Sequence, residues 1–406
     1  MGMNDTPSSE RVHIAFFGRR NTGKSSLVNA VTGQPLSLVS DVKGTTTDPV
    51  RKAMELLPLG PVVIIDTPGI DDEGSLGEMR VSRAERVLEQ TDIAVLVTDA
   101  PESEGSPKLP AEDLELIRLF QAKRLPFVIA WNKADLRNTN EYAPDPESAT
   151  VSVSARTGEN ISKLKEKLAA FADAGGRIHR ALVSDLIEPE DMVLLVIPID
   201  ESAPKARLIL PQQQVIRDIL DAGGSFAGCR PEELEGTLLK LKKNPALVIT
   251  DSQAFGEVAK ILPEEIPLTS FSLLFARYKG DLEKLIQGTE VLKKLEDGDR
   301  VLVSEGCTHH RQCKDIGTVK LPGWIRELCG HDPQFDFTSG TGFPEDLSAY
   351  RLIVHCGGCM LQEKEMRRRM DLADRAGVPM VNYGAAIACA NGVLERSLKP
   401  LANVAK

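Results

Sequence analysis

Apolar and polar residues follow one another along the chain in short blocks that predict an α/β protein. Short apolar runs predict buried strands, and the amphipathic stretches between some of them predict helices. The predicted strands lie at residues 12–17, 62–65, 126–131, 151–153, 192–199, 206–210, 246–250, 301–303 and 352–354. The clearest predicted helices lie at residues 26–31, 212–220 and 254–261. Strands that alternate with helices favour mostly parallel sheets covered by helices.

The length of the chain predicts more than one domain. A chain of 406 residues is too long for one ordinary hydrophobic core, so we expect two or three cores. The pattern places a polar tail at residues 1–10, a first α/β domain at 11–175, a small α/β domain at 184–268 and a third α/β domain at 269–406. The small middle domain carries no ligand cluster, and an unpaired edge of its sheet would be a natural dimer surface.

A phosphate-binding loop follows the first predicted strand. Residues 18–25 read G-R-R-N-T-G-K-S, the spacing in which backbone N–H groups surround phosphate oxygens at the start of a helix. Gly18 and Gly23 allow the tight turn, Lys24 would pair with the β- and γ-phosphates, and Ser25 would hold Mg²⁺. The strand before the loop and the helix after it supply the context that this motif requires.

Two further segments match the phosphate end of a nucleotide site. Asp66 ends the strand at residues 62–65 and opens D-T-P-G, where a carboxylate can reach Mg²⁺ through water and the Gly69 N–H can meet the γ-phosphate. Between the loop and Asp66 lies G-T-T-T-D, in which we take Thr46 as the Mg²⁺-sensing threonine, with Thr45 and Thr47 as close alternatives.

Two other segments match the base end. Residues 132–135 read N-K-A-D after a predicted strand, and Asp135 can accept hydrogen bonds from both N1–H and the 2-amino group of guanine, a pair that adenine lacks. Ser154 and Ala155 follow the strand at residues 151–153, where their backbone can contact the guanine O6. Taken singly these motifs are weak, but their order along the chain predicts a guanine-nucleotide site.

This first region resembles the small GTPases of the translation-factor-like class, and within it the TrmE and Era group. The resemblance covers about residues 10–172 and implies a P-loop GTPase domain with a mixed, mostly parallel sheet that binds GTP or GDP with Mg²⁺. It also implies that Asn21 helps to bind K⁺, although Asn21 could simply be a loop residue that tolerates unusual dihedrals. Ile70 stands where Ras-like GTPases carry a catalytic glutamine, so slow hydrolysis is expected. The expected nucleotide and Mg²⁺ contacts are Gly18, Asn21, Thr22, Gly23, Lys24, Ser25, Ser26, Thr45, Thr46, Asp66, Gly69, Asn132, Lys133, Asp135, Ser154 and Ala155.

The third domain carries a candidate metal site. Its two predicted strands lead into C-T-H at residues 307–309 and H-C-G-G-C at residues 355–359, and parallel strand ends lie on one edge of a sheet. Cys356 and Cys359 have the spacing that lets two thiolates reach one metal centre. With Cys307 they make three thiolates, which suit a 4Fe–4S cluster with one open iron. A Cys₃His zinc site fits the same spacing.

The combination of the two halves resembles the maturation GTPases of FeFe-hydrogenase, the HydF family. The resemblance covers the whole chain and implies a GTPase domain, a dimerisation domain and a cluster-binding domain. It implies a 4Fe–4S cluster held by Cys307, Cys356 and Cys359, with His309 and His355 as less secure ligands. It further implies a homodimer or tetramer that carries a precursor of the diiron subcluster, made with two radical-SAM maturases, and delivers it to apo-hydrogenase.

A second hypothesis is an RNA-associated GTPase whose C-terminal domain is stabilised by zinc. Its support is the GTPase resemblance and the run at residues 367–369, three arginines. The net charge of −10 and the absence of aromatic residues among basic ones argue against nucleic acid. We therefore expect the arginines to form a solvated helix face. We also expect no membrane partner and a cytoplasmic location, because the first ten residues are polar and no apolar run could span a bilayer.

Overall fold

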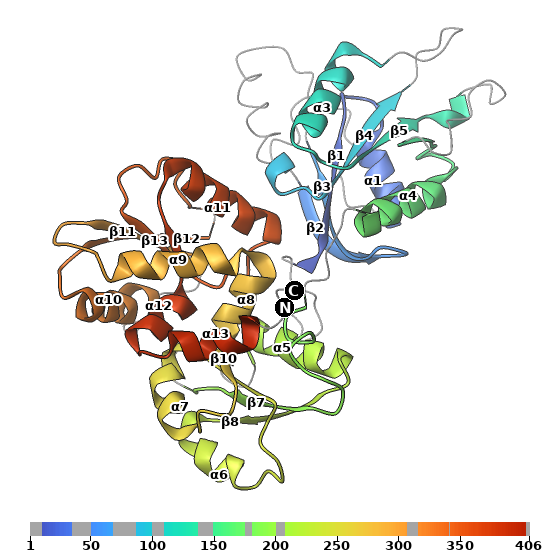
Figure 1. Cartoon of the computed structure of the whole chain (residues 1–406). Helices are drawn as coiled ribbons and strands as arrows, with labels where there is room; N and C mark the ends of the chain where they lie inside the picture. Colours follow the sequence, from blue (N-terminus) through green and yellow to red (C-terminus); the bar gives the residue numbers. More distant parts are fainter. Residues whose placement is uncertain are drawn as a thin grey trace. The chain divides into compact units, whose positions relative to one another are not determined.

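The chain folds into two compact units, Met1–His179 and Arg180–Lys406, which are described separately (Figure 1). The computed structural model describes residues 10–34, 50–67, 87–99, 109–136, 149–174, 181–199, 208–306, 316–340 and 342–402. Among these residues no helix is long and apolar enough to cross a membrane.

The first unit is built on a six-stranded sheet in the order β2-β3-β1-β4-β5-β6. β2 pairs antiparallel with β3, and all other pairs are parallel. This confirms the predicted mixed, mostly parallel sheet. The strands are β1 (Val12–Phe17), β2 (Val50–Leu56), β3 (Gly60–Asp66), β4 (Ile93–Asp99), β5 (Phe127–Asn132) and β6 (Thr150–Ser152); the helices are α1 (Lys24–Thr32), α3 (Ala111–Ala122), the short 3₁₀ turn η2 (Ala134–Leu136) and α4 (Ile161–Ala174).

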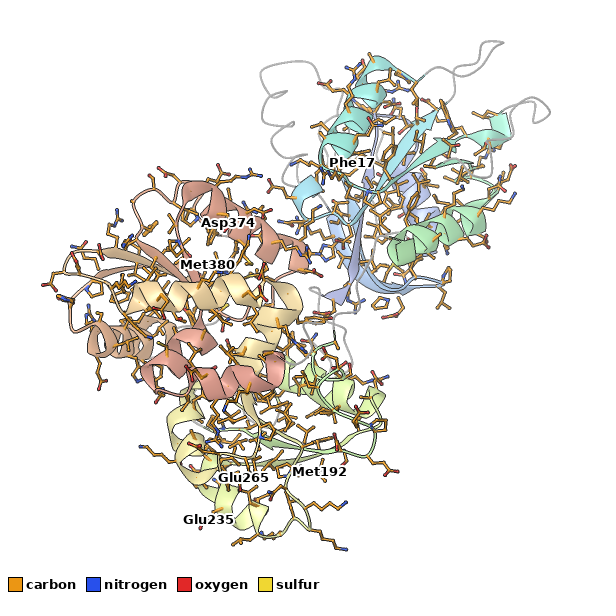
Figure 2. All side chains as sticks on the ribbon, in the orientation of Figure 1. Phe17, Met192, Glu235, Glu265, Asp374 and Met380 are labelled. Atoms are coloured by element: carbon orange, nitrogen blue, oxygen red, sulfur yellow. The ribbon has the colours of Figure 1, made fainter. Side chains whose placement is uncertain are left out.

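Side-chain alternation along β1 feeds a core on each face of this sheet. Ile14 and Phe16 belong to one buried cluster, with side chains from α1 and α4. Ala15 and Phe17 belong to the other, with side chains from α3; Figure 2 labels Phe17 in this core. Successive residues of a strand point to opposite faces, so a strand buried along its whole length must be covered by helices on both sides.

The second unit contains two four-stranded parallel sheets, in the orders β10-β9-β7-β8 and β12-β11-β13-β14. The strands are β7 (Met192–Val196), β8 (Ser225–Cys229), β9 (Leu247–Thr250), β10 (Leu268–Ser270), β11 (Arg300–Glu305), β12 (Gln334–Ser339), β13 (Leu352–His355) and β14 (Met380–Asn382). The α-helices are α5 (Leu210–Asp221), α6 (Leu234–Leu238), α7 (Phe255–Ile261), α8 (Phe271–Lys279), α9 (Leu282–Leu292), α10 (Leu321–Cys329), α11 (Glu363–Ala376), α12 (Tyr383–Ala390) and α13 (Leu394–Ala402). Short turns of other helix types are η3 (Pro231–Glu233), η4 (Ser252–Ala254) and the π-helical η5 (Ile316–Lys320).

One hydrophobic core joins the two sheets of the second unit. Residues of β7, β9, β11 and β13 belong to the same buried cluster. Helix α12 carries buried residues from Tyr383 to Cys389 and contacts elements around both sheets, including η4, α7, α10 and β14. The boundary predicted between residues 268 and 269 lies within β10. Dividing this unit into two domains therefore stays a prediction.

One predicted strand is wrong where the structure describes it. Residues 206–210 are apolar except for Arg207, but Leu210 begins α5 and Leu208 precedes it outside any strand. Pro211 explains the difference, because proline cannot donate to a strand ladder and favours the first turn of a helix. The Gln212 side chain also accepts a hydrogen bond from the N–H of Ile209 at 3.0 Å, which caps the helix start.

Candidate functional site

The phosphate loop joins β1 to α1 in a conformation that only glycine can adopt at two places. Gly23 has φ +82°, and a Cβ there would lie 2.3 Å from the Asn132 side-chain nitrogen. A Cβ on Gly18 would lie 2.3 Å from the carbonyl oxygen of Val97. Thr22 is buried, and its hydroxyl donates to the Arg19 carbonyl at 2.9 Å. The loop is therefore tightly curled, and glycine is required at both positions.

Lys24 and Ser25 both contact Asp66, at the carboxyl end of β3. Lys24 Nζ lies 3.3 Å from Asp66 Oδ1, and the Ser25 hydroxyl donates to Oδ2 at 2.8 Å. Lys24 and Asp66 are each more than nine-tenths buried, so this pairing is stronger than one on the surface. The structure thus brings together the three residues predicted to handle phosphate and Mg²⁺. Ser26 lies in the first turn of α1 beside them.

Asn132 connects the phosphate loop to the loop that follows β6. Its side-chain amide donates to the Thr22 carbonyl at 2.8 Å and, more weakly, to the Gly23 carbonyl at 3.4 Å. Its side-chain oxygen accepts from the Ala155 N–H at 3.0 Å. Because Asn132 is buried, one side chain links three of the segments singled out in the sequence.

The base-recognition residues lie next to one another. The Ser154 hydroxyl donates to Asp135 Oδ1 at 2.6 Å, and it accepts from the Thr157 N–H at 3.1 Å. Asp135 lies in η2, which follows β5, and it is only partly buried. Its carboxylate is therefore held by one hydrogen bond and remains accessible from solvent.

A cluster of charges beside the phosphate loop was not predicted from the sequence. Asp99, at the end of β4, pairs with Arg19 at 2.9 Å and with Lys133 at 3.0 Å. Arg19 Nε also lies 3.5 Å from the carboxylate of Asp113, which is fully buried. The sequence feature that could have identified Asp99 is an acidic residue at the end of an apolar strand, the same feature that identifies Asp66.

The other predicted nucleotide residues fall into two groups. Asn21 is exposed with φ +64°, a conformation in which asparagine is enriched; this is compatible with both interpretations given above. Thr45, Thr46 and Gly69 lie outside the described residues.

The cysteine loop, residues 356–361, begins at the carboxyl end of β13. Cys356 Sγ accepts hydrogen bonds from the N–H of Gly306 at 3.1 Å and of Gly358 at 3.4 Å. Gly306 follows β11, the neighbouring strand, so two strand ends meet at this sulfur. Burial raises the pKa of the Cys356 thiol, although both N–H groups oppose the change. Burial and then the charge of Cys356 raise the pKa of Cys359 to about 11.

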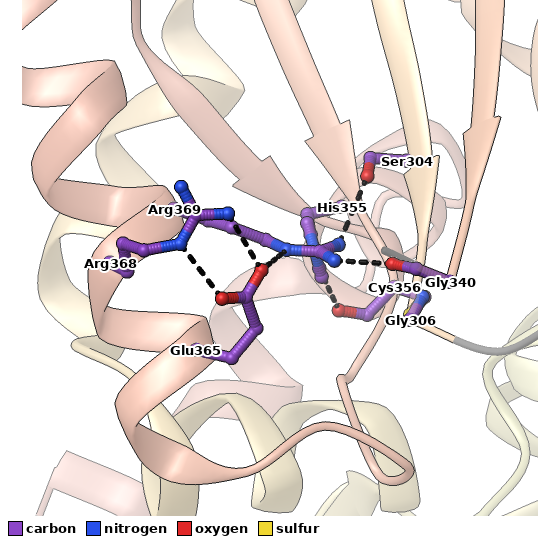
Figure 3. Close-up of polar contacts among 8 residues, drawn as sticks. All are labelled: Ser304, Gly306, Gly340, His355, Cys356, Glu365, Arg368 and Arg369. Carbon is purple, nitrogen blue, oxygen red and sulfur yellow. Dashed lines mark hydrogen bonds and ion pairs between the residues drawn. The ribbon is translucent and has the colours of Figure 1, made fainter. Parts of the chain in front are cut away.

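His355 is buried with both ring nitrogens in hydrogen bonds (Figure 3). Nδ1 lies 2.7 Å from the Cys356 carbonyl oxygen, which can only accept, so Nδ1 carries the proton. Nε2 lies 3.1 Å from Arg369 Nη1. Burial, followed by the charge of Arg369, lowers the pKa of His355 to about 4, so the ring is neutral near pH 7 and Nε2 accepts from the guanidinium.

Arg369 contradicts the expectation of a solvated arginine face. Its side chain is fully buried, whereas Arg367 is about half exposed and Arg368 lies between them. Arg369 donates to Glu365 at 2.8 Å and to the Gly340 carbonyl. Burial raises the pKa of Glu365, but hydrogen bonds from Arg368 and Arg369 outweigh it and hold that pKa below its usual value. Helical spacing explains the difference, since Arg369 lies on the buried face of α11 with Met366, Met370 and Ala373.

The described residues hold part of the predicted metal site. Cys356 and Cys359 share one loop beside Gly306, while Cys307 and His309 lie outside the part of the chain that the structure describes. Within that part, no group of three or more His, Cys, Asp or Glu side chains could hold a metal ion.

Comparison with curated and solved proteins finds GTPases. The chain is 35% identical over 161 residues to the tRNA modification GTPase MnmE of Hamiltonella defensa, covering 39% of this chain and 35% of that protein. It is 36% identical over 203 residues to GTPase Der of Thermomicrobium roseum, covering 45% and 43%. It thus spans less than half the length of either relative. A crystal structure of Aquifex aeolicus Era bound to GDP·AlF₄⁻ aligns with a TM-score of 0.34 and 20% identity, over 54% of this chain and 92% of that one.

Three family models match consecutive parts of the chain. Residues 13–133 match the 50S ribosome-binding GTPase family. Residues 182–280 match the hydrogen maturase F dimerization domain, and residues 283–400 match the hydrogen maturase F tetramerization domain. The two maturase models together cover more than half of the chain and follow a GTPase domain, as the sequence resemblance implied. The chain therefore belongs to the hydrogen maturase F family.

Proposed function

We propose that this protein is a GTP-hydrolysing scaffold of FeFe-hydrogenase maturation that holds a 4Fe–4S cluster and delivers a diiron precursor to apo-hydrogenase. The observation that carries the proposal is the occurrence, in one chain, of the Lys24–Ser25–Asp66 constellation and of the cysteine loop within a domain matching hydrogen maturase F. Two radical-SAM maturases and a cytoplasmic location belong to the same proposal.

The nucleotide site would exchange protein contacts for ligand contacts. In the structure, Asp66 pairs with Lys24 and accepts a hydrogen bond from Ser25. When Mg·GTP binds, Lys24 would turn to the β- and γ-phosphates and Ser25 to Mg²⁺, leaving Asp66 to hold a water of the metal. Asp135, held by Ser154, would accept the two guanine N–H groups. GTP hydrolysis would then change contacts with partners by reordering loops near the γ-phosphate, rather than drive chemistry at the cluster.

Slow hydrolysis that K⁺ accelerates is part of the proposal for this site. Asn21 stands exposed at the loop with φ +64°, where its side chain can reach a cation beside the phosphates. GTP turnover should be faster in KCl than in NaCl at equal ionic strength, and Asn21→Ala should remove the difference. Equal rates in the two salts for the unchanged protein would exclude a K⁺ role.

The cysteine loop fits a thiolate-bound cluster. Cys356 Sγ already accepts two backbone N–H groups, the contacts that tune cluster sulfurs. Gly306, which donates one of them, directly precedes Cys307 in the chain, so the third proposed ligand follows a residue that contacts Cys356. A cluster held by Cys307, Cys356 and Cys359 would supply a redox-active centre with one iron free of cysteine. Zinc bound by the same three thiolates would supply no redox-active centre.

His355 is better placed as a support than as a ligand. Its Nδ1 donates to the Cys356 carbonyl and its Nε2 accepts from Arg369, so binding a metal would break a buried hydrogen bond. His309 remains a candidate for the open iron.

The cluster is tested by anaerobic purification and reconstitution with iron and sulfide. We expect about four irons per chain, bleached by Cys356→Ser, and hydrogenase activation that requires the loaded protein. Cys389→Ser is a matched control, because this thiol lies in the last turn of α12, where its charged neighbours are Lys293 and Glu290 rather than residues of the cysteine loop. A colourless protein that binds one zinc, or activation that survives Cys356→Ser, would overturn the proposal.

The dimerization match supports assembly through the edge of the first sheet of the second unit. β8 lies at one edge of that sheet, and its Phe226 is 39% exposed. Within the described part of the chain, β8 pairs with β7 on one side and forms the sheet edge on the other. An edge strand with an exposed aromatic side chain can pair with the same strand of a second copy. We propose this edge as the dimer contact. The tetramerization match adds a second level of assembly.

The alternative, an RNA-associated GTPase with a zinc-stabilised domain, has support in the name of the MnmE relatives, which are tRNA modification GTPases. The burial of Arg369 weakens it, since only part of the arginine run is exposed. Binding of tRNA by the metal-free protein at moderate salt would favour this alternative.

A further inference from the structure

Lys279 is a buried lysine that contacts the cysteine loop from a different helix. It is the last residue of α8 and only 2% exposed. Its Nζ donates to the carbonyl oxygens of Cys359 at 2.9 Å and of Leu361 at 2.8 Å. Burying an ammonium group is costly, so Lys279 is tolerated there because these peptide dipoles point their oxygens at it.

Arg369 contacts the other end of the loop through His355. The guanidinium is fully buried and donates to His355 Nε2, and His355 Nδ1 donates to the Cys356 carbonyl. The same guanidinium reaches Ser304 at 3.4 Å and the Gly340 carbonyl. Figure 3 shows that these partners come from the ends of neighbouring strands. Arg369 thus fixes the strand ends from which the loop starts.

Together the two contacts orient the peptide groups of the loop. The carbonyl oxygens of Cys356, Cys359 and Leu361 all accept hydrogen bonds from outside the loop. A peptide group whose oxygen is held on one side presents its N–H on the other. The Met360 N–H belongs to the same peptide group as the Cys359 carbonyl that Lys279 holds, and it hydrogen-bonds the Cys359 thiol, as this orientation requires.

The same two side chains bring positive charge to a place where thiolates are costly. Lys279 Nζ lies 2.9 Å from the carbonyl oxygen of Cys359, and His355 alone stands between the Arg369 guanidinium and the Cys356 carbonyl. Both cations are buried, so water screens their charge from the two cysteines only weakly. A cation near an anionic centre stabilises its more reduced, more negative state.

We propose that Lys279 and Arg369 are positioning residues of the cysteine loop, which hold its N–H groups toward the sulfurs and compensate the negative charge of the thiolate-bound centre. The inference rests on the proposed function, because the centre in question is the proposed cluster. It assigns a role to two residues outside the cysteine and histidine motifs, from α8 and α11.

The test compares reduction potentials of the reconstituted full chain, measured by redox titration followed with electron paramagnetic resonance. Lys279→Met and Arg369→Met should each shift the one-electron equilibrium about ten-fold or more toward the oxidised state, which corresponds to about 59 mV. Lys279→Gln keeps a donor without the charge. It should retain iron but show the same direction of shift.

Two surface variants are matched controls. Lys284 pairs with Asp374 and Arg367 pairs with Glu363, each about half exposed, so Lys284→Met and Arg367→Met should move the equilibrium less than about two-fold. Circular dichroism verifies folding, and Lys279→Gln replaces Lys279→Met if the latter is unfolded. A folded Lys279→Met protein that loses iron also supports positioning. Wild-type potentials in Lys279→Gln and Arg369→Met overturn the inference, whereas a wild-type protein that takes up no iron overturns the proposed function itself.

Discussion

Replacing Asn132 by alanine should destabilise the first unit and separate its phosphate loop from its base loop. The substitution leaves the Thr22 carbonyl and the Ala155 N–H without the partners that they have at 2.8 and 3.0 Å. A buried group that loses its partner costs about 1–3 kcal/mol. Two such groups, one of them partly exposed, give a loss of about 2–4 kcal/mol in the free energy of unfolding.

Tryptophan fluorescence can follow this unit alone. The chain has two tryptophans: Trp131, buried in β5 next to Asn132, and Trp324 in α10 of the second unit. In a Trp324→Phe background, urea unfolding reports on Trp131 only. With a urea slope of about 2 kcal/mol per molar, Asn132→Ala should lower the midpoint by about 1–2 M. Affinity for a fluorescent GDP should fall about ten-fold or more.

Asn160→Gly is the matched control. The Asn160 side chain donates to the Ser152 carbonyl at 2.8 Å, at the far end of the loop that follows β6 and separate from the bonds that Asn132 makes, and its φ of +56° suits glycine. This variant should lose stability with little change in GDP affinity. The reasoning fails if Asn132→Ala leaves both the midpoint and the GDP affinity unchanged, or if Asn160→Gly weakens GDP binding equally.

Four further predictions concern other places. Gly23→Ala should reduce GDP affinity about ten-fold or more, because φ +82° and a Cβ contact at 2.3 Å are both unfavourable; unchanged binding by calorimetry would contradict this. Gly306→Ala should lower iron content, since its Cβ would lie 2.6 Å from Leu361 Cγ, and adding Leu361→Ala should restore part of it. Phe226→Glu should shift sedimentation toward the monomer, whereas an unaltered profile would exclude β8 as the contact. Burial raises the pKa of Cys229, so less thiolate exists at pH 8 than in the unfolded chain, and alkylation measured by mass spectrometry should be slower in the native protein.

The nucleotide site could be predicted from sequence because each of its parts follows a buried strand. Strand periodicity located Asp66, Asn132 and Ser154 at strand ends, and parallel strands bring such ends to one edge. Gly18 and Gly23 could be predicted because the loop motif requires glycine at both positions. The structure shows the reason, since a Cβ at either position would lie 2.3 Å from a neighbouring atom. The Asp99 cluster is not evident from the motifs, although Arg19 and Lys133 stand in them, because no motif pairs either residue with the end of β4 or with Asp113 of α3.

The surroundings of the cysteine loop were less predictable. Arg369 was taken for a surface residue because it stands among charged residues, yet helical spacing from Met366 to Ala373 places it on the buried face. Lys279 carries an even weaker signal, since a lysine that ends a helix is ordinarily solvated. Arg369 does pair with Glu365, four residues earlier on its own helix. The other partners described for Arg369 and Lys279 are backbone carbonyls, a serine and a histidine from other elements, and no local pattern encodes those contacts.

The shared core of the second unit limits how the protein can be dissected. The two maturase family models meet between residues 280 and 283, which invites truncation there. Yet α12, from the later half, has nearly all its residues buried and contacts α7 and η4 of the earlier half. Either fragment alone would expose an apolar surface to water and tend to aggregate. We therefore expect the two halves to fold and unfold as one cooperative unit, and they should be expressed together.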